Sequence, residues 1–307
     1  MRTLALESEA AAPLVTDLEL VAGPVRLDVE SFGLTDRGRV RPSNEDNFLI
    51  ADLADSPRQS AAPDGAELGH LLAVADGVGG NCAGERASRL AVLGLEPFLL
   101  DALAGPGEVR GLDGDGLTRV FQEAVRRAQE ALFQAVARRP DWRGMGTTLT
   151  LAYVWGRELF VAHVGDSRAY LLRDGELRQL TQDHTLVAEL VRHGVLSPAE
   201  VAHHPYRHVI INSVGGTEPG LRVATTRMEL HPDDVLLLCS DGLTEMLPDE
   251  RIRDVVRAEA DLERACTRLV AEANEAGGKD NVTVVLARFR EGVDVELVAE
   301  EDDNERR

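Results

Sequence analysis

The sequence is poor in cysteine, in basic residues and in long apolar runs, and each shortage excludes a class of protein. Its 307 residues include only Cys82, Cys239 and Cys266. An odd number of cysteines at spacings that match no zinc pattern argues against both a disulfide framework and a cysteine-bound zinc ion. We therefore expect the protein to work in a reducing compartment.

Basic residues are outnumbered by acidic ones. The chain has 33 Lys and Arg against 53 Asp and Glu, a formal net charge of −20. Because phosphate backbones attract clustered Lys and Arg, this balance argues against a nucleic-acid partner. The excess of acid has two interpretations, solubility or a site that concentrates divalent cations, and composition does not choose between them.

Long apolar runs are also missing. No stretch reaches the roughly 18 continuous apolar residues of a membrane span. The N-terminal stretch "MRTLALESEAAAP" carries acids where a signal peptide has a basic start. We expect a cytoplasmic protein without a membrane partner. With 44% hydrophobic and 28% charged residues, the composition is that of a soluble globular protein.

The chain divides into three parts by composition. Residues 1–25 form an N-terminal extension that we expect to be flexible, and residues 291–307 form an acidic tail with eight acids against two arginines. The fold is expected between them, in residues 26–290. Within that part, residues 184–216 begin amphipathic and become polar and His-rich, which predicts a mobile excursion from the core.

Paired strand patterns dominate residues 26–290. The segment "TTLTLAYVWGRELFVAHVGD" predicts one hairpin, and "SRAYLLRDGELRQLT" predicts a second with Asp174-Gly175 as its turn. Helical spacing occupies residues 83–104, 117–139, 249–258 and 261–276, before "NVTVVLARF" returns to strand. Consecutive hairpins with few crossovers predict an α+β fold of antiparallel sheets covered by helices.

Acidic residues stand at the ends of several apolar runs or in tight turns. They are Glu45, Asp46, Asp76, Asp166, Asp241 and Asp280. A carboxylate taken from water without a partner costs several kcal/mol, and the cations nearby, Arg41, Arg168 and Lys279, are too few to neutralise six acids. Hard divalent ions such as Mg²⁺ or Mn²⁺ prefer carboxylate, carbonyl and water oxygens. Each acid alone is explained as well by a turn or a helix cap, so the metal hypothesis depends on the set.

Six motifs occur in order and together carry a family resemblance. They are "GRVRPSNEDNF", "VADGVGGNCAGERAS", "GMGTTLTL", "HVGDSRAYLLRDGELRQLTQDH", "LLLCSDGLTEML" and "GGKDNVTVVL". Over about residues 28–290 the sequence resembles the metal-dependent serine/threonine protein phosphatases of the type 2C family, in the style of the short bacterial members. The resemblance implies an antiparallel β-sandwich flanked by helices on both sides, with two Mg²⁺ or Mn²⁺ ions at one end.

The resemblance also implies roles for individual residues. Asp76 would bridge the two ions, and Asp241 and Asp280 would complete the shell of the first. The Gly77 carbonyl would bind the second ion, with Glu45 beside it, either directly or through water. Asp166 with Asp241 would hold a third, weaker ion, and the alternative is that Asp166 pairs with Arg168 or caps the following turn.

Three further residues take roles from the same resemblance. Arg41 would grip the substrate phosphate, because a planar guanidinium can donate two hydrogen bonds at once. Asp46 would orient a water at the ions, as would Asn281.

Two positions depart from patterns found in relatives of this kind. Members with a histidine after the Asp-Gly pair use it as a proton donor to the leaving group, whereas this chain has Val78. Where such proteins often have "ITRALG", this chain has "IINSVGG", so Asn212 replaces an arginine. This second change is expected to affect either the excursion or its contact with substrate. His203, His204 and His208 are expected to be exposed loop residues, and His184 a structural one.

The function implied is hydrolysis of phosphoserine and phosphothreonine by a metal-activated water. The expected partners are phosphorylated proteins, either a Ser/Thr kinase that the enzyme opposes or the substrates of that kinase, and the enzyme is expected to be a monomer. Two alternatives remain: a phosphatase-like binding module without turnover, and a hydrolase of small phosphate esters. The first is disfavoured because Asp76, Asp241 and Asp280 are all present. Only a comparison of substrates separates the second.

Overall fold

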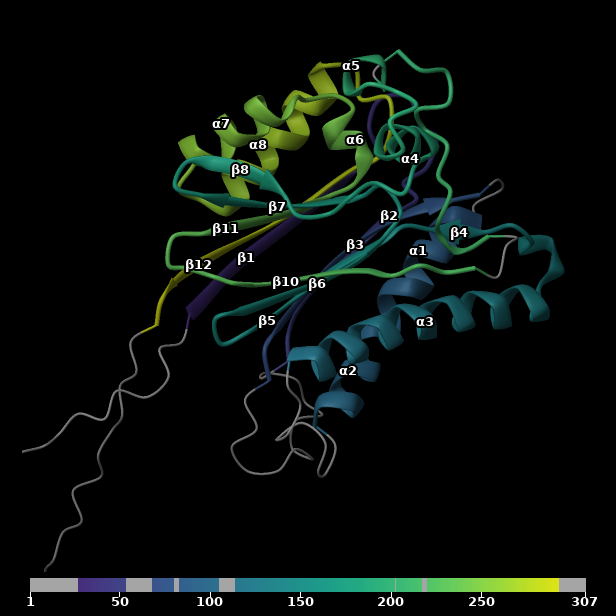
Figure 1. Ribbon diagram of the computed structural model, residues 1–307, viewed down its shortest axis with the longest axis horizontal. Coiled ribbons are helices and arrows are strands. Elements are labelled where there is room, and N and C mark those ends of the chain that lie inside the picture. Colours follow the sequence, from purple (N-terminus) through teal and green to yellow (C-terminus); the bar gives the residue numbers. More distant parts are fainter. Residues whose placement is uncertain are drawn as a thin grey trace, which may run out of the picture.

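Two antiparallel β-sheets stack face to face, and helices cover the outer side of each (Figure 1). This computed structural model describes residues 27–53, 68–79, 83–104, 114–201, 203–216 and 220–292. The predicted extension at residues 1–25 and nearly all of the tail at 291–307 lie outside the described residues. The arrangement confirms the predicted α+β fold. None of the helices that the structure describes combines the length and apolar character that a membrane span requires.

The smaller sheet has the strand order β1-β12-β11-β7-β8. Its strands are β1 (Leu27–Asp36), β7 (Arg168–Arg173), β8 (Glu176–Gln179), β11 (Val235–Cys239) and β12 (Val282–Glu291). The larger sheet has the order β10-β6-β5-β3-β4-β9, with β2 also paired to β3. Its strands are β2 (Asp46–Asp52), β3 (His70–Val78), β4 (Gly146–Thr147), β5 (Leu149–Trp155), β6 (Glu158–Val164), β9 (Val214–Gly215) and β10 (Ala224–Glu229).

Helices form the two outer layers. The larger sheet is covered by α1 (Ala83–Leu93), α2 (Leu95–Ala104) and α3 (Gly114–Arg138), and the short 3-10 helix η3 (Pro140–Trp142) follows α3. The smaller sheet is covered by α7 (Asp249–Ala258) and α8 (Leu262–Glu275), next to α6 (Asp241–Thr244). The excursion carries α4 (Leu186–Arg192) and α5 (Pro198–Val201).

One helix prediction needs correction. The pattern at 83–104 is not one helix, because α1 ends at Leu93 and α2 begins at Leu95. Gly94 lies at the break, where the backbone entropy of glycine disfavours a continuous helix. Pro97 lies in the first turn of α2, where the missing N–H of proline costs nothing.

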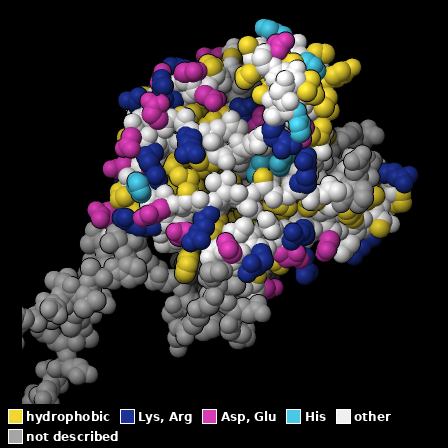
Figure 2. Space-filling model, viewed as in Figure 1, with side chains coloured by type: hydrophobic (Ala, Val, Ile, Leu, Met, Phe, Trp, Pro, Cys, Tyr) yellow, Lys and Arg dark blue, Asp and Glu magenta, His cyan; other side chains and the backbone are white. Residues whose placement is uncertain are grey.

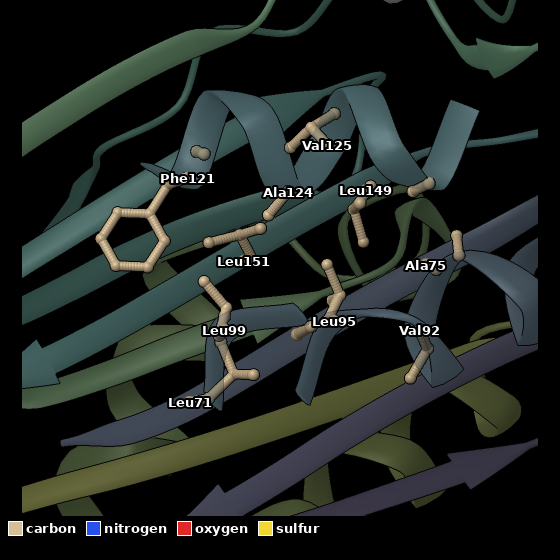
Figure 3. Close-up of a cluster of buried hydrophobic side chains, with 14 of the residues drawn as sticks. Leu71, Ala75, Val92, Leu95, Leu99, Phe121, Ala124, Val125, Leu149 and Leu151 are labelled. Carbon is tan, nitrogen blue, oxygen red and sulfur yellow. The ribbon is translucent and has the colours of Figure 1, made fainter. Parts of the chain in front are cut away.

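Burial on both faces explains the unbroken apolar run of β3. Leu71, Ala73 and Ala75 pack under the helices, whereas Leu72 and Val74 pack between the two sheets. Figure 3 shows the helical side of this packing, where Phe121 and Val125 of α3 and Leu99 of α2 face the sheet. Because side chains alternate along a strand, a central strand of a four-layer fold must be apolar at every position.

The two predicted hairpins are present. β5 pairs with β6, and β7 pairs with β8. The second turn has Asp174 and Gly175 at φ values of 51° and 83°. Two successive residues with positive φ are the signature of the type I′ turn that suits a two-residue hairpin.

Candidate metal centre

The predicted site residues lie at one end of the sandwich, where the apolar layer between the sheets stops. Asp76 is near the end of β3 and continues the series Leu72 and Val74 that faces the other sheet. Asp46 opens β2 and is paired in register with Asp76. Asp241 follows β11 at the start of α6, and Asp280 precedes β12. The strand ends therefore deliver carboxylates from both sheets to one place.

A cavity of about 1010 Å³ opens among these residues. The predicted residues that line it are Arg41, Glu45, Asp76, Gly77, Asp166, Asp241, Asp280 and Asn281. Asp46 is not among them. It is buried behind the cavity wall, with 4% of its surface exposed. The structure thus brings together every candidate named from the sequence, eight at the cavity and one behind it.

Two hydroxyl groups hold Asp46 across the gap between the sheets. Ser240 Oγ and Thr283 Oγ1, both from the smaller sheet's side, each donate to Asp46 Oδ2 at 2.7 Å. Burial raises the pKa of Asp46 to about 6, and these hydrogen bonds oppose the rise. Sequence analysis missed Ser240 and Thr283. The only signal available was their position beside Asp241 and Asn281.

A second pair of hydroxyl groups fixes the backbone of Asp76. Thr148 Oγ1 accepts from the Asp76 N–H at 2.8 Å, and Thr147 Oγ1 donates to the Asp76 carbonyl at 2.8 Å. Both threonines are fully buried. They belong to the "GMGTTLTL" motif, which is one of the six motifs of the family resemblance. The sequence predicted no role for their side chains.

Burial, followed by mutual repulsion, raises the pKa values of the acids of the cavity. Burial raises the pKa of Asp76 well above its ordinary value, and the charges of Asp46 and Asp241 raise it further. Burial also raises the pKa of Asp241, followed by the charge of Asp166. For Asp166 itself, burial raises the pKa to about 7. Burial and the neighbouring carboxylates thus outweigh the nearby guanidinium groups, and the pKa values of these acids lie above their ordinary values.

The geometry of Arg168 removes one alternative for Asp166. Arg168 donates to both carboxylate oxygens of Asp183, with its closest contact at 2.7 Å, so it is engaged away from Asp166. Within the described residues, Asp166 Oδ1 is buried without a hydrogen-bond partner. Among the same residues, Asp46 Oδ1 and Asp241 Oδ1 are also buried without a hydrogen-bond partner.

These orphaned oxygens fit a divalent cation. Buried acceptors without donors are rare because each costs free energy, and an ion would satisfy several at once. Among the described residues no group of three or more His, Cys, Asp or Glu side chains lies close enough together to hold a metal ion by itself. Mg²⁺ keeps several waters and needs few direct protein ligands, so a smaller set of carboxylates still suits this ion.

Arg41 stands at the mouth of the cavity. Its Nη2 donates to Asp280 Oδ2, and 53% of its side chain is exposed. That hydrogen bond is the main cause that raises the pKa of Arg41. An exposed guanidinium beside clustered carboxylates can meet an incoming anion at the entrance.

Asn281 has a structural task in this arrangement. Its Oδ1 accepts from the Glu45 N–H, and its Nδ2 donates to the carbonyls of Arg37 and Ser43, all at 2.8 Å. These contacts use both N–H groups of the amide, so the side chain positions the loop that carries Arg41 and Glu45.

Glycine is required where two segments touch at the cavity. A Cβ at Gly77 would lie 2.2 Å from the Gly84 carbonyl oxygen and 2.7 Å from that of Glu45. Such distances are closer than any real Cβ contact, so only glycine allows α1 and the Glu45 loop to approach β3 together.

The excursion lies beside the cavity and is anchored at its base. Asn212, 6% exposed, donates to His184 Nδ1 at 2.9 Å and exchanges two hydrogen bonds with the backbone of Arg222. His184 Nδ1 also accepts from the Gly165 N–H, next to Asp166. The departure at Asn212 therefore serves the conformation of the excursion in this structure. Figure 2 shows histidines gathered on the side of α4 and α5. Among them, His203 is exposed as expected, His204 is half-buried, and exposed His208 pairs with Glu245.

Comparison with known protein sequences gives consistent matches. The family model described as protein phosphatase 2C matches residues 54–287. The chain is 34% identical over 252 residues to a serine/threonine phosphatase, stp, of Listeria welshimeri, which covers 82% of this chain and 92% of that protein. It is 40% identical over 253 residues to the serine/threonine protein phosphatase PstP of Mycobacterium tuberculosis, which covers 82% of this chain and 43% of that longer protein.

Comparison with solved structures also finds serine/threonine phosphatases. The crystal structure of the Mycobacterium tuberculosis phosphatase PstP matches with a TM-score of 0.71 at 37% identity, covering 85% of this chain and 99% of that one. A PstP catalytic domain in complex with two manganese ions matches with a TM-score of 0.70 at 35% identity, covering 86% and 100%. The fold, the carboxylate-lined cavity and these relatives agree, and the chain belongs to the protein phosphatase 2C family of metal-dependent hydrolases.

Proposed function

We propose that this protein removes phosphate from phosphoserine and phosphothreonine in proteins, and that it opposes a Ser/Thr kinase of the same cell. The observation that carries the proposal is the convergence of carboxylates with orphaned oxygens on a cavity that has Arg41 at its mouth. Relatives named serine/threonine phosphatases support the substrate class. We further propose that residues 26–290 act as one catalytic domain, with residues 184–216 as a flap, and that the enzyme works as a cytoplasmic monomer.

The metal ligands we propose are those suggested by the sequence. Asp76 would lie between two Mg²⁺ or Mn²⁺ ions, with Asp241 and Asp280 on the first and Glu45 with the Gly77 carbonyl on the second. When bound, such ions supply a water of lowered pKa and positive charge for the phosphoryl oxygens. The two manganese ions of a structural relative support this proposal.

The remaining chemistry belongs to the chain's own groups. Arg41 would bind two phosphate oxygens and orient the ester, because a guanidinium presents paired N–H donors in one plane. Asp46 would hold water at the cavity wall through its free Oδ1, since its Oδ2 is engaged by Ser240 and Thr283. Val78 is exposed at the cavity and cannot donate a proton, so the leaving oxygen receives its proton from another group.

A covalent cysteine intermediate is not part of the proposal. Cys239 and Cys266 are buried, and burial raises the pKa of each thiol to about 12. A thiol of such high pKa is a poor nucleophile at neutral pH. Cys82 lies outside the described residues, so activity should be measured after thiol alkylation as well.

The decisive experiment measures phosphate release from phosphoserine and phosphothreonine peptides beside small phosphate esters, with Mn²⁺ or with EDTA. We expect Mn²⁺-dependent turnover that favours the peptides and survives alkylation. The variants Asp76→Asn and Asp241→Asn should lose turnover, whereas Asp254→Asn, on the exposed side of α7, should keep it. Full activity in EDTA would rule out the mechanism, preference for small esters would favour the general hydrolase, and absence of turnover with bound Mn²⁺ would favour a binding module.

A third, weaker ion is proposed at Asp166 and Asp241. Asp166→Ala should retain two tight Mn²⁺ sites in a calorimetric titration and lose the weaker one. Loss of a tight site would instead place Asp166 at the central pair, and unchanged binding with unchanged turnover would leave it structural.

A further inference from the structure

A groove runs between α1 and the C-terminal end of α3, on the outer face of the helical layer. The two helices lie in contact on the larger sheet (Figure 1). The groove encloses about 560 Å³, and its apolar surface comes from Leu90, Leu93, Ala135 and Trp142. Leu93 is 60% exposed, although it is a large aliphatic side chain in the middle of a folded domain. Apolar surface left open inside a groove indicates a binding surface more often than an isolated exposed leucine does.

Four arginines surround this apolar surface: Arg86, Arg89, Arg138 and Arg139. None of the described residues that line the groove is acidic. Asp141, next to Trp142 in the sequence, pairs with Arg139. Arg89 and Arg138 make no ion pair with any residue that the structure describes, in a chain whose net charge is −20. Positive charge is thus concentrated where the rest of the composition predicts negative charge.

Trp142 is held in place by two of these arginines. The Cζ atoms of Arg86 and Arg139 lie 4.6 Å and 5.0 Å from the centre of the indole ring. Cation–π contacts of this kind fix both the ring and the guanidinium groups. The groove is therefore preorganised, which lowers the entropic cost of binding.

We propose that this groove docks an acidic segment of a partner protein, one that carries apolar side chains between its carboxylates. Arginine binds carboxylates through two parallel hydrogen bonds, and the apolar floor offers a place for a leucine-sized side chain. An extended polyanion such as nucleic acid, or an anionic membrane, is a poorer match because the remaining surface of this acidic chain would repel it.

The groove is separate from the metal centre but shares a helix with it. Gly84, at the start of α1, faces Gly77 and Glu45 on the inner side, whereas Arg89 and Leu93 point outward. A docked partner would thus sit next to the cavity without entering it. Binding to the groove does not depend on turnover, so its test stands apart from the proposed phosphatase activity.

The test uses a short fluorescent peptide with two leucines flanked by glutamates and aspartates, titrated with the full chain by fluorescence anisotropy. The variant pair Arg89→Glu with Arg138→Glu should weaken binding about tenfold or more, equivalent to about 1.4 kcal/mol. Arg119→Glu, an exposed arginine of α3 outside the groove, is the matched control and should change affinity less than about twofold. All three proteins should unfold at similar temperatures and hydrolyse a small phosphate ester alike.

Further probes separate the occupants. Replacement of the two leucines by serine should weaken the peptide, and high salt should weaken it further because the arginines are exposed. Equal binding by the variant pair, or by the serine peptide, would overturn the proposal. The proposal would also be overturned if a DNA oligonucleotide or anionic vesicles bound the wild-type chain as tightly as the peptide and bound the Arg89→Glu, Arg138→Glu variant more weakly. If a peptide of residues 293–307 bound more tightly than the leucine-containing peptide, the occupant would be the acidic tail of another copy of this chain, which would overturn the proposal of a different partner protein.

Discussion

At the scale of single residues, a buried carboxylate behaves according to what surrounds it. Asp234 is 1% exposed, yet Arg173 donates to both of its oxygens at 2.8 Å and 2.6 Å. Among the described residues no arginine or lysine pairs with Asp76, which faces the charges of Asp46 and Asp241. Asp234 stabilises the fold because it is paired. Asp76 lowers the free energy of unfolding as long as no cation is bound beside it.

This contrast gives a stability prediction. In EDTA at pH 7.5, Asp76→Asn should raise the melting temperature by about 3 °C, because removal of one repelling charge gains about 1 kcal/mol. Asp234→Asn is the matched comparison and should lower it, since Arg173 would lose its partner. Thermal scans of both variants decide. A lower melting temperature for Asp76→Asn would mean that its carboxylate is already neutralised without metal.

His163 gives a prediction about pH. It is fully buried in β6, between Thr150 Oγ1 at 2.8 Å and the Gln182 carbonyl at 3.1 Å. Burial lowers its pKa to about 3. Below the ordinary histidine pKa of about 6.5, the unfolded chain binds a proton that the folded chain refuses, so stability is lost as the pH falls.

His163→Gln should remove that part of the pH dependence. Between pH 6 and pH 4, wild type should lose up to about 1.4 kcal/mol per pH unit more than the variant. Urea unfolding of both proteins in EDTA measures the difference between their free energies of unfolding at each pH. The acids are the same in both proteins, so their contributions cancel in this difference. Parallel pH profiles would show that His163 is protonated in the folded protein.

At the scale of elements, one buried side chain bridges the base of the flap. Asn212 joins His184, at the flap's entry, to Arg222 beyond its exit. Asn212→Ala removes all three of these hydrogen bonds. Amide exchange across residues 184–211 should then become about tenfold faster, since one buried hydrogen bond is worth about 1 kcal/mol or more.

The control for this prediction is internal to the same experiment. Exchange in β3 and β11 should not change, because neither strand contacts Asn212 through a described hydrogen bond. Uniform acceleration throughout the chain would indicate global destabilisation, and no acceleration would show that the flap is held elsewhere.

Element prediction from the sequence worked where the pattern was long. The apolar runs of β3 and β11, the Asp174-Gly175 turn and the period of α3 were all legible, because burial and turn geometry constrain every residue in them. The break at Gly94 was missed since apolar spacing continues across it. Thr147, Thr148, Ser240 and Thr283 were missed for another reason: a buried hydroxyl has no sequence period, and its partner lies on a different strand.

The candidate site was predictable to a similar extent. The acids were found because each ends an apolar run or turn, and because six motifs occur in order. Their common cavity could not be derived from spacing alone, since Glu45 and Asn281 meet across 236 positions. The pairing of Arg168 with Asp183 was likewise invisible, because two acids lay within its reach.

At the scale of the whole molecule, metal binding should stabilise the fold. Ions that bind the native chain alone add about 2.7 kcal/mol per site at a concentration one hundred times the dissociation constant. The melting temperature should therefore rise with Mn²⁺ and return with EDTA. Asp76→Asn should lose most of the rise, whereas Asp254→Asn should keep it. A melting temperature of the wild-type protein that does not change when Mn²⁺ is added would contradict the proposed ligand set.

The position of β12 has a consequence for how the enzyme is made. β12 is the last strand described, yet it lies inside the smaller sheet, between β1 and β11, and Asp280 and Asn281 immediately precede it. During synthesis, the ribosome must therefore release almost the entire catalytic region before the smaller sheet can close or the cavity can gain its last carboxylate. Because such long-range strand pairing is slow, we expect a nascent fragment that ends before residue 280 to lack phosphatase activity.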